Sequence, residues 1–283
     1  MTLWLNGRFL LLYGGNDPLR LSWPSFKTRV DELHLPETDA YDLLGFFVAE
    51  VSALTKWVAG APLNTDDNML IETRAPLLFD QLDSVETGSR SIASIGRWVT
   101  PVHAIIAGIS AREAQKLSAI VRARTIFVDG IRVELEKDPR GAFELYEQAH
   151  TLNPVNYQFR SFLESRLVAR AGQAYLARHF QEAERLLRKA LAYIPTSRPA
   201  NFLMAETLYD SGQHDRGLLV FGKLLKHYPH YYQGHLSLAE RLLTSGRPAD
   251  GLAHLEFVLN YVPNSRDALS LKTRITPSAW TVQ

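Results

Sequence analysis

Four prolines in the second half of the chain, Pro154, Pro195, Pro229 and Pro263, most constrain its fold. The last two intervals between them are 34 residues and the first is 41. Residues of matching size precede the prolines in four columns, 24, 12, 8 and 5 positions earlier: Gly130, Ala171, Ala205 and Ala239; Ala142, Ala183, Gly217 and Gly251; Tyr146, Leu187, Phe221 and Leu255; Ala149, Ala190, Leu224 and Val258.

Such columns predict a repeated pair of antiparallel helices, A and B. Small residues let the two backbones approach where the helices cross, and the large residue fills the space toward the next pair. Proline ends helix B because it lacks an N–H and clashes with the preceding turn. An ordinary helical bundle is the alternative, but it does not explain why four columns recur at the same distances from the prolines. Residues 123–277 therefore resemble the tetratricopeptide repeat family, over more than half of the chain.

The repeat register predicts the helices directly. Gly212 and Gly246 are expected where helix A ends and turns, a position that favours glycine. Asn264 and Ser265 are expected to begin a last helix, which would end before Pro277 and cover the edge of the final pair. The predicted helices span residues 111–136, 139–152, 157–177, 180–193, 199–211, 214–227, 232–245, 248–261 and about 265–275.

The first 78 residues follow a different pattern. Residues 3–5 and 9–13 are apolar runs joined through Asn6-Gly7, which predicts a β-hairpin. Because an isolated hairpin is marginally stable, we expect it to join a larger sheet whose other strands lie outside this sequence. Residues 38–59 carry apolar side chains at helical spacing and predict a long helix.

Two segments of this region, TLWLNGRFLLLYGGNDPL and APLNTDDNMLIETRAP, resemble the C-terminal end of the bacterial spermidine-synthase-like (polyamine aminopropyltransferase) domain. The resemblance covers residues 1–78 and implies a remnant of a Rossmann-like methyltransferase fold. In that family the glycine-rich nucleotide loop and the catalytic aspartate lie earlier, and no G-x-G-x-x-G motif occurs here. Some members carry tetratricopeptide repeats downstream and membrane helices upstream. The resemblance implies ancestry rather than activity.

The predicted fold is thus mainly α. It comprises an α/β remnant with a β-hairpin and helices (1–78), a helical connector and cap (79–122), a tetratricopeptide α-solenoid of about four helix pairs with a C-terminal capping helix (123–277), and a tail (278–283). The formal net charge of +1 gives no overall field for nucleic acid. The chain has no cysteine, which excludes thiol chemistry and cysteine zinc sites. It has no secretory leader and no apolar run of about 18 residues. We expect a cytoplasmic protein, with membrane association only through a missing upstream segment.

Two clusters suggest chemistry, and each has a simpler explanation. The acidic cluster Asp66, Asp67 and Glu72 could bind a metal ion or a polyamine, but turn bonding of side chains to nearby N–H groups is the better explanation. His227, His230 and His235 alternate with tyrosines, but no two of them share a helix face at i,i+4 spacing, so packing is the better explanation. We therefore predict no catalytic residue, no metal and no cofactor.

The inner, A-helix face of the array offers the candidate binding site. Glu206 and Glu240 occupy equivalent positions of successive pairs, with Phe202, Tyr209 and Leu236 beside them. Acids beside apolar residues suit a basic peptide, whereas the alternative is a solvated helix face. Two functions remain open. The chain is either a protein-interaction scaffold attached to a non-catalytic remnant, or the C-terminal part of an aminopropyltransferase whose nucleotide-binding half is missing.

Overall fold

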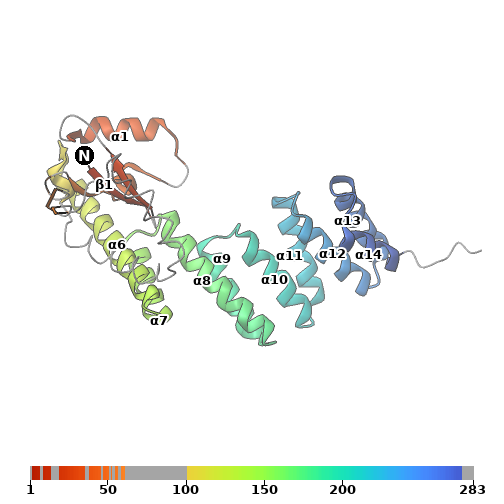
Figure 1. Ribbon diagram of the computed structural model, residues 1–283. Coiled ribbons are helices and arrows are strands. Elements are labelled where there is room, and N and C mark those ends of the chain that lie inside the picture. Colours follow the sequence, from red (N-terminus) through yellow and green to blue (C-terminus); the bar gives the residue numbers. More distant parts are fainter. Residues whose placement is uncertain are drawn as a thin grey trace, which may run out of the picture. The chain divides into compact units, whose positions relative to one another are not determined.

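The computed structural model describes residues 2–6, 9–13, 19–35, 38–45 and 47–50, a few positions between 52 and 60, and all of 101–275. These residues are mainly helical, with paired helices in a tetratricopeptide-like array (Figure 1). The chain divides into two compact units, Met1–Phe162 and Leu163–Gln283. The division falls within helix α8 (Tyr157–Leu176).

A three-stranded antiparallel sheet begins the first unit. Strand β1 (Thr2–Asn6) pairs with β2 (Phe9–Tyr13) from Thr2↔Tyr13 to Asn6↔Phe9, which confirms the predicted hairpin. Strand β4 (Phe47–Glu50) pairs with the other edge of β1, so the strand order is β2-β1-β4. One of the further strands that the hairpin needs therefore comes from within the chain.

The long helix predicted over residues 38–59 is wrong beyond Gly45. Helix α2 (Ala40–Gly45) stops there, and β4 begins at Phe47. Phe47, Val48 and Ala49 are all buried, so both faces of this short segment are covered. Periodicity alone does not separate a short apolar run of this kind from a buried helix segment. The open edge of β1 supplies the backbone partners that favour the strand.

Three helices build the core of the first unit: α1 (Trp23–Glu32), α2 and α6 (Ala111–Leu135). Trp23 meets the ring of Tyr41 edge-on at 4.7 Å. The buried Arg124 on α6 donates to the carbonyl of Phe47 and joins α6 to the sheet. Burial lowers the pKa of Arg124 to about 10. In the described part of the predicted connector, before α6, lie a 3-10 turn η2 (Val102–Ala104) and β5 (Ile106–Ala107), which pairs in parallel with β3 (Leu21–Ser22).

A buried carboxylate ties α2 to the first helix pair. Helix α7 (Pro139–Leu152) packs on α6, and the turn after it carries Asn153 and Asn156. Both amides donate to the carboxylate of Asp42, at 2.7 and 3.0 Å. All three side chains are buried, so this small network fixes the end of α7 relative to α2.

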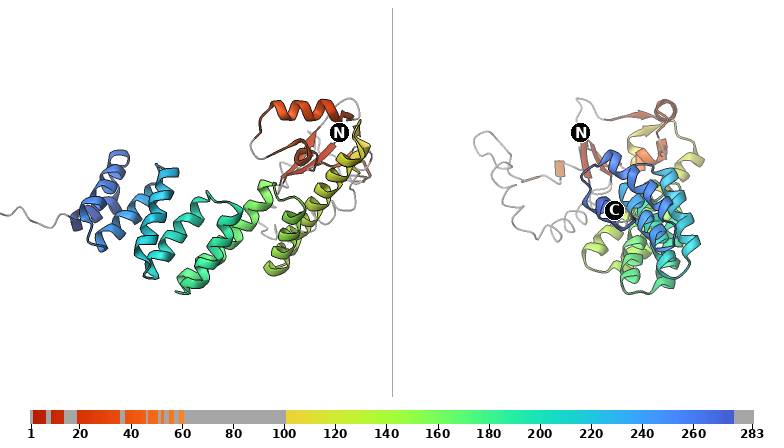
Figure 2. Two further views of the ribbon diagram at one scale, coloured as in Figure 1. Left: turned by 180° about the vertical axis from the view of Figure 1, so that it is seen from behind. Right: turned by 90° about the vertical axis from the view of Figure 1, so that its right-hand side faces the viewer.

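The second unit continues the array as predicted. Each helix lies within two residues of its expected bounds, and the helices follow one another as antiparallel pairs (Figure 2). The prolines of the register stand two residues after the ends of α7, α9, α11 and α13. After α8 the elements are α9 (Phe180–Tyr193), α10 (Arg198–Asp210), α11 (His214–His227), α12 (Tyr232–Thr244), α13 (Pro248–Tyr261) and the capping helix α14 (Arg266–Ile275).

The small-residue columns lie where the paired helices cross, as predicted. Ala205 and Ala239 have no exposed surface. A Cβ placed on Gly217 would lie 2.9 Å from the carbonyl oxygen of Ala205, and one on Gly251 would lie 3.0 Å from that of Ala239. The backbones of α10 and α11, and of α12 and α13, therefore approach so closely that these columns tolerate only very small residues.

The turn between helices A and B uses the left-handed backbone region in every pair. Gly212 and Gly246 adopt φ values of +87° and +74°, which confirms the predicted stop signals. Lys137 and Arg178 occupy the corresponding turns of the first two pairs at +67° and +59°. A side chain in this region costs free energy that glycine avoids.

Candidate functional site

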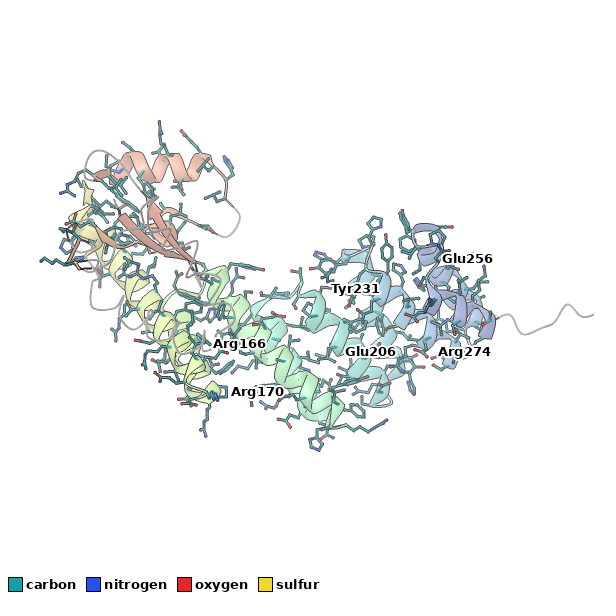
Figure 3. The ribbon with its side chains drawn as sticks, viewed as in Figure 1. Arg166, Arg170, Glu206, Tyr231, Glu256 and Arg274 are labelled. Atoms are coloured by element: carbon teal, nitrogen blue, oxygen red, sulfur yellow. The ribbon has the colours of Figure 1, made fainter. Side chains whose placement is uncertain are left out.

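The residues predicted to form a binding face lie on α10 and α12, in the second unit. Figure 3 labels Glu206 of α10 among them. Glu206 is only 7% exposed, and its carboxylate forms an ion pair with Arg241 of α12. Arg241 also contacts Asp210 at 3.0 Å. Desolvation lowers the pKa of Arg241, but the hydrogen bond and charge of Glu206 outweigh it, so the pKa is raised overall. The charge of Glu206 is therefore balanced within the array.

Tyr209 belongs to the same polar network. Its hydroxyl lies 3.0 Å from the carbonyl oxygen of Arg241 and 2.7 Å from the Thr244 hydroxyl, and its ring lies under the Arg241 guanidinium. Tyr175, 34 residues earlier on α8, donates to Asp210 at 2.7 Å. Burial, and then the hydrogen bond to Asp210, raise the pKa of Tyr175. We call the contacts made by Tyr175 and Tyr209 the tyrosine bridges, because each links an A helix to the next one.

Phe202 lies mainly in the packing of the third pair. It is half-buried against the α10–α12 core and meets the rings of Phe221 and Tyr231 edge-on, at 5.9 and 5.6 Å. Its environment is thus an aromatic cluster inside the array.

Leu236 and Glu240 line a cavity of about 360 Å³ between α12 and α14. Leu236 is half-buried against the core of the last pair, while the Glu240 side chain is 48% exposed, 3.5 Å from Arg274. Asp267, in the first turn of α14, adds a second carboxylate to the cavity wall. The rest of the lining is polar or apolar without charge: Gln233, Ser237, Ser270 and Leu271. We call this cavity the α12–α14 groove.

The structure thus divides the predicted residues into two sets. Leu236 and Glu240 meet in the α12–α14 groove, whereas Glu206 and Tyr209 lie in the buried network around Arg241. Sequence reasoning missed Arg241 and Asp267. Asp267 could have been noticed in the sequence, because it lies at the start of the predicted capping helix, where an acidic side chain interacts favourably with the helix dipole. Nothing in the repeat spacing indicated that it lines a cavity with residues of α12.

The histidines were predicted to pack between repeats, and His235 does pack, mainly against α13 of its own pair. Its Nδ1 lies 2.9 Å from Nδ1 of His254, its Nε2 lies 3.0 Å from the Pro229 carbonyl oxygen, and its ring stacks on Phe257 at 4.4 Å. Burial lowers the pKa of both histidines. Within the described residues, no three His, Cys, Asp or Glu side chains group closely enough to hold a metal ion. The acidic cluster Asp66, Asp67 and Glu72 lies outside the described residues.

Comparisons with known proteins find similar repeats only among solved structures. No protein-family model matches the chain, and no curated protein matches it. The structure of YrrB, described as a TPR protein with an unusual peptide-binding site, has a TM-score of 0.40 and 15% identity, covering 69% of this chain and 87% of that one. The structure of MamA gives 0.41 and 12%, covering 71% and 97%, and MamA from Desulfovibrio magneticus RS-1 gives 0.39 and 14%, covering 72% and 99%.

The successive helix pairs, which repeat every 34 residues in the last two intervals, define the class, a tetratricopeptide-like array. The low scores of the comparisons add no argument to this. The resemblance of residues 1–78 to aminopropyltransferases has no support from the comparisons. In the part of the chain that the structure describes, no helix combines the length and apolarity needed to cross a bilayer.

Proposed function

We propose that this chain is a protein-interaction scaffold that binds a basic peptide segment in the α12–α14 groove. One observation carries the proposal: an open cavity of about 360 Å³ in which Leu236 stands beside the carboxylates of Glu240 and Asp267. Grooves of this kind bind peptides through an apolar anchor and orient them through charge.

The charges specify the ligand. Arg274 lies 3.5 Å from Glu240, and both side chains are about half exposed, so the pair is weak and a ligand cation can replace Arg274. An apolar side chain of the ligand would then lie on Leu236, while a lysine or arginine would meet Glu240 or Asp267. Glu206 was predicted to share this role, and we leave it out of the proposed groove because it pairs with Arg241.

Site-directed photo-crosslinking tests the proposal. A benzoylphenylalanine at Ser237, which lines the groove, should crosslink a partner peptide that mass spectrometry identifies. The identified peptide should then bind the Glu240→Gln/Asp267→Asn variant about tenfold more weakly, because two exposed charge contacts are lost. The difference should shrink as salt screens those charges.

A matched control neutralises two acids on α13. Asp250 and Glu256 are about half exposed and do not line the groove, so the Asp250→Asn/Glu256→Gln variant changes the net charge equally. This control should keep wild-type affinity. Equal affinity of the groove variant, or equal losses in both variants, would refute the proposal.

The finer relationship of residues 1–78 to aminopropyltransferases is a proposal that rests on the two sequence segments alone. The two segments imply shared ancestry without activity. Isothermal calorimetry should therefore detect no binding of decarboxylated S-adenosylmethionine by this chain. Micromolar binding of that nucleoside would instead support the alternative function, a part of an aminopropyltransferase.

A further inference from the structure

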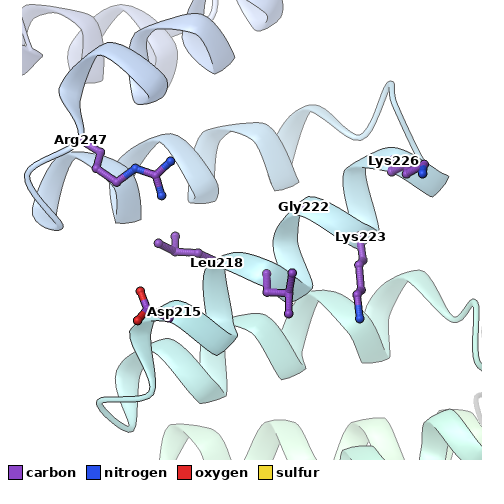
Figure 4. Close-up of a pocket in the computed structure, with 7 residues that line it drawn as sticks. Asp215, Leu218, Gly222, Lys223, Lys226 and Arg247 are labelled. Atoms are coloured by element: carbon purple, nitrogen blue, oxygen red, sulfur yellow. The ribbon is translucent and has the colours of Figure 1, made fainter.

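A second groove lies on the B helix of the third pair, on the side of α11 opposite its buried column residues. It has a volume of about 430 Å³. Leu218, Leu219 and Gly222 of α11 line it, and Arg247 reaches it from the turn before α13 (Figure 4). We call it the α11 groove.

Two features of the sequence open the α11 groove. A Cβ placed on Gly222 would meet nothing within 4 Å, so the missing side chain leaves a notch in the helix surface. The corresponding residues of α9 and α13, 34 positions away, are the long side chains Arg188 and Glu256. Leu219, one turn before the notch, is 60% exposed, while its α9 counterpart is Arg185. The third pair alone among these three therefore combines an exposed leucine with a gap beside it.

The rim of the groove is basic at one end. Lys223 and Lys226 line it near the end of α11. Within the described residues, neither lysine forms an ion pair, whereas Arg247 meets Asp250 at 2.7 Å. The opposite end carries one acid, Asp215, and Arg247 lies on the same side (Figure 4).

The same face of α9 has a different construction. There Glu184 forms ion pairs with Arg188 and with Arg216, so the charges are satisfied within the array. The helix dipole explains why an acid begins α11 and lysines end it. The dipole does not explain the exposed Leu219. It also does not explain Gly222, because a glycine at an exposed helix position lowers stability relative to alanine. Exposed apolar surface beside two lysines that form no ion pair is instead typical of an interaction site.

We propose that the α11 groove is a second docking surface, and that its ligand is an acidic peptide segment with an apolar anchor. The anchor fills the notch over Gly222 between the leucines, and the carboxylates that follow it meet Lys223 and Lys226. Asp215 and Lys226 are separated by roughly 16 Å along the helix, which an extended peptide of about five residues spans. A nucleic acid fits less well, because the lining holds no aromatic ring for base stacking.

Fluorescence anisotropy with the full chain tests the proposal. The probe is a labelled synthetic peptide of two leucines followed by four glutamates, compared with a version in which glutamine replaces every glutamate. We expect the acidic peptide to bind and the glutamine peptide to bind about tenfold more weakly at low salt. Failure of the acidic peptide to bind at about 1 mM, where even a weak complex forms, would overturn the proposal.

Variants locate the binding on the groove. Lys223→Glu/Lys226→Glu should weaken binding about tenfold, through charge. Gly222→Gln adds no charge, and its Cβ would have no neighbour within 4 Å, so the fold should be kept while the filled notch weakens binding roughly fivefold through lost apolar contact. The matched control, Arg185→Glu/Lys189→Glu, makes the same charge change on the same face of α9 and should keep wild-type affinity.

Three further results would overturn the proposal. One is equal weakening by the α9 control, which would indicate general charge attraction. Another is unchanged binding in the Gly222→Gln variant. The third is tighter binding of an oligothymidylate or of anionic lipid vesicles at the same residues, since these ligands belong to other classes. The Glu240→Gln/Asp267→Asn variant should leave this binding unchanged, so failure of one docking surface is separable from failure of the other.

Discussion

Two glycines on one helix provide a direct test of the array geometry. Gly217 and Gly222 both lie inside α11, so changing either to alanine should stabilise the helix itself by about 1 kcal/mol. Gly222 has open space around it and should show this gain. At Gly217 the new Cβ would lie 2.9 Å from the Ala205 carbonyl oxygen and 2.9 Å from the Tyr209 nitrogen. Both are backbone atoms, so the helices must move apart.

The change in unfolding free energy expected for Gly217→Ala follows from two opposing effects, the helix gain and the packing cost. Overpacking at a rigid site costs about 1–3 kcal/mol, so Gly217→Ala should be destabilised by up to about 2 kcal/mol after the helix gain is subtracted. Because that gain is common to both variants, their difference reports the packing cost alone. Gly251→Ala should lie between them, since its nearest contacts are 3.0 and 3.6 Å.

Urea unfolding followed by far-UV circular dichroism measures the series, and hydrogen exchange of α10 and α11 shows where the loss occurs. The expected order of stability is Gly222→Ala, wild type, Gly251→Ala and Gly217→Ala. If Gly217→Ala is as stable as Gly222→Ala, the crossing of α10 and α11 does not lie where the columns place it.

Three further predictions concern polar groups and turns. Arg241→Met should destabilise the array by about 3 kcal/mol in urea unfolding, because it leaves the buried Glu206 carboxylate unpaired, and Glu206→Gln added to it should recover most of the loss. Burial lowers the pKa of His235 and His254 below the ordinary 6.5, so the unfolded chain binds more protons below that pH. The unfolding midpoint should therefore fall as the pH drops below 6.5, with a smaller fall in His235→Gln/His254→Gln; equal falls would be contrary to this reasoning. Arg178→Gly should raise stability by about 0.5–1 kcal/mol in the same assay, because φ is +59° there, and a decrease would count against the assigned turn.

The array could be predicted from the sequence because its determinants are local and repeated. Proline ends a helix wherever it stands, and Ala205 or Gly217 can mark a crossing because only small residues fit there. Helix bounds, turns and core columns followed from these rules alone. The strand β4 did not, because the run from Phe47 to Ala49 is apolar on both faces and its partner β1 is more than 40 positions away.

The candidate site was less predictable because it depends on contacts between pairs. Glu206 and Glu240 occupy equivalent positions in the sequence repeats. Glu206 is buried and pairs with Arg241, whereas Glu240 is half exposed beside Arg274. Which cation meets which acid depends on the twist from one pair to the next, and no single column records it. The α11 groove was missed for another reason: an absent side chain, Gly222, opens it.

The tyrosine bridges have a mechanical consequence. Tyr175 and Tyr209 each link one A helix to the next, but the corresponding residue of α12 is Leu243, which has no hydroxyl to donate. We therefore expect the joint between α12 and α14, where apolar contacts and the exposed Glu240–Arg274 pair lie, to be more compliant than the α8–α10 and α10–α12 joints. A chain pulled from its C-terminus should yield at this joint first. The α12–α14 groove is lined by residues of both helices. A bound peptide would therefore contact both and raise the force at which the last helix detaches.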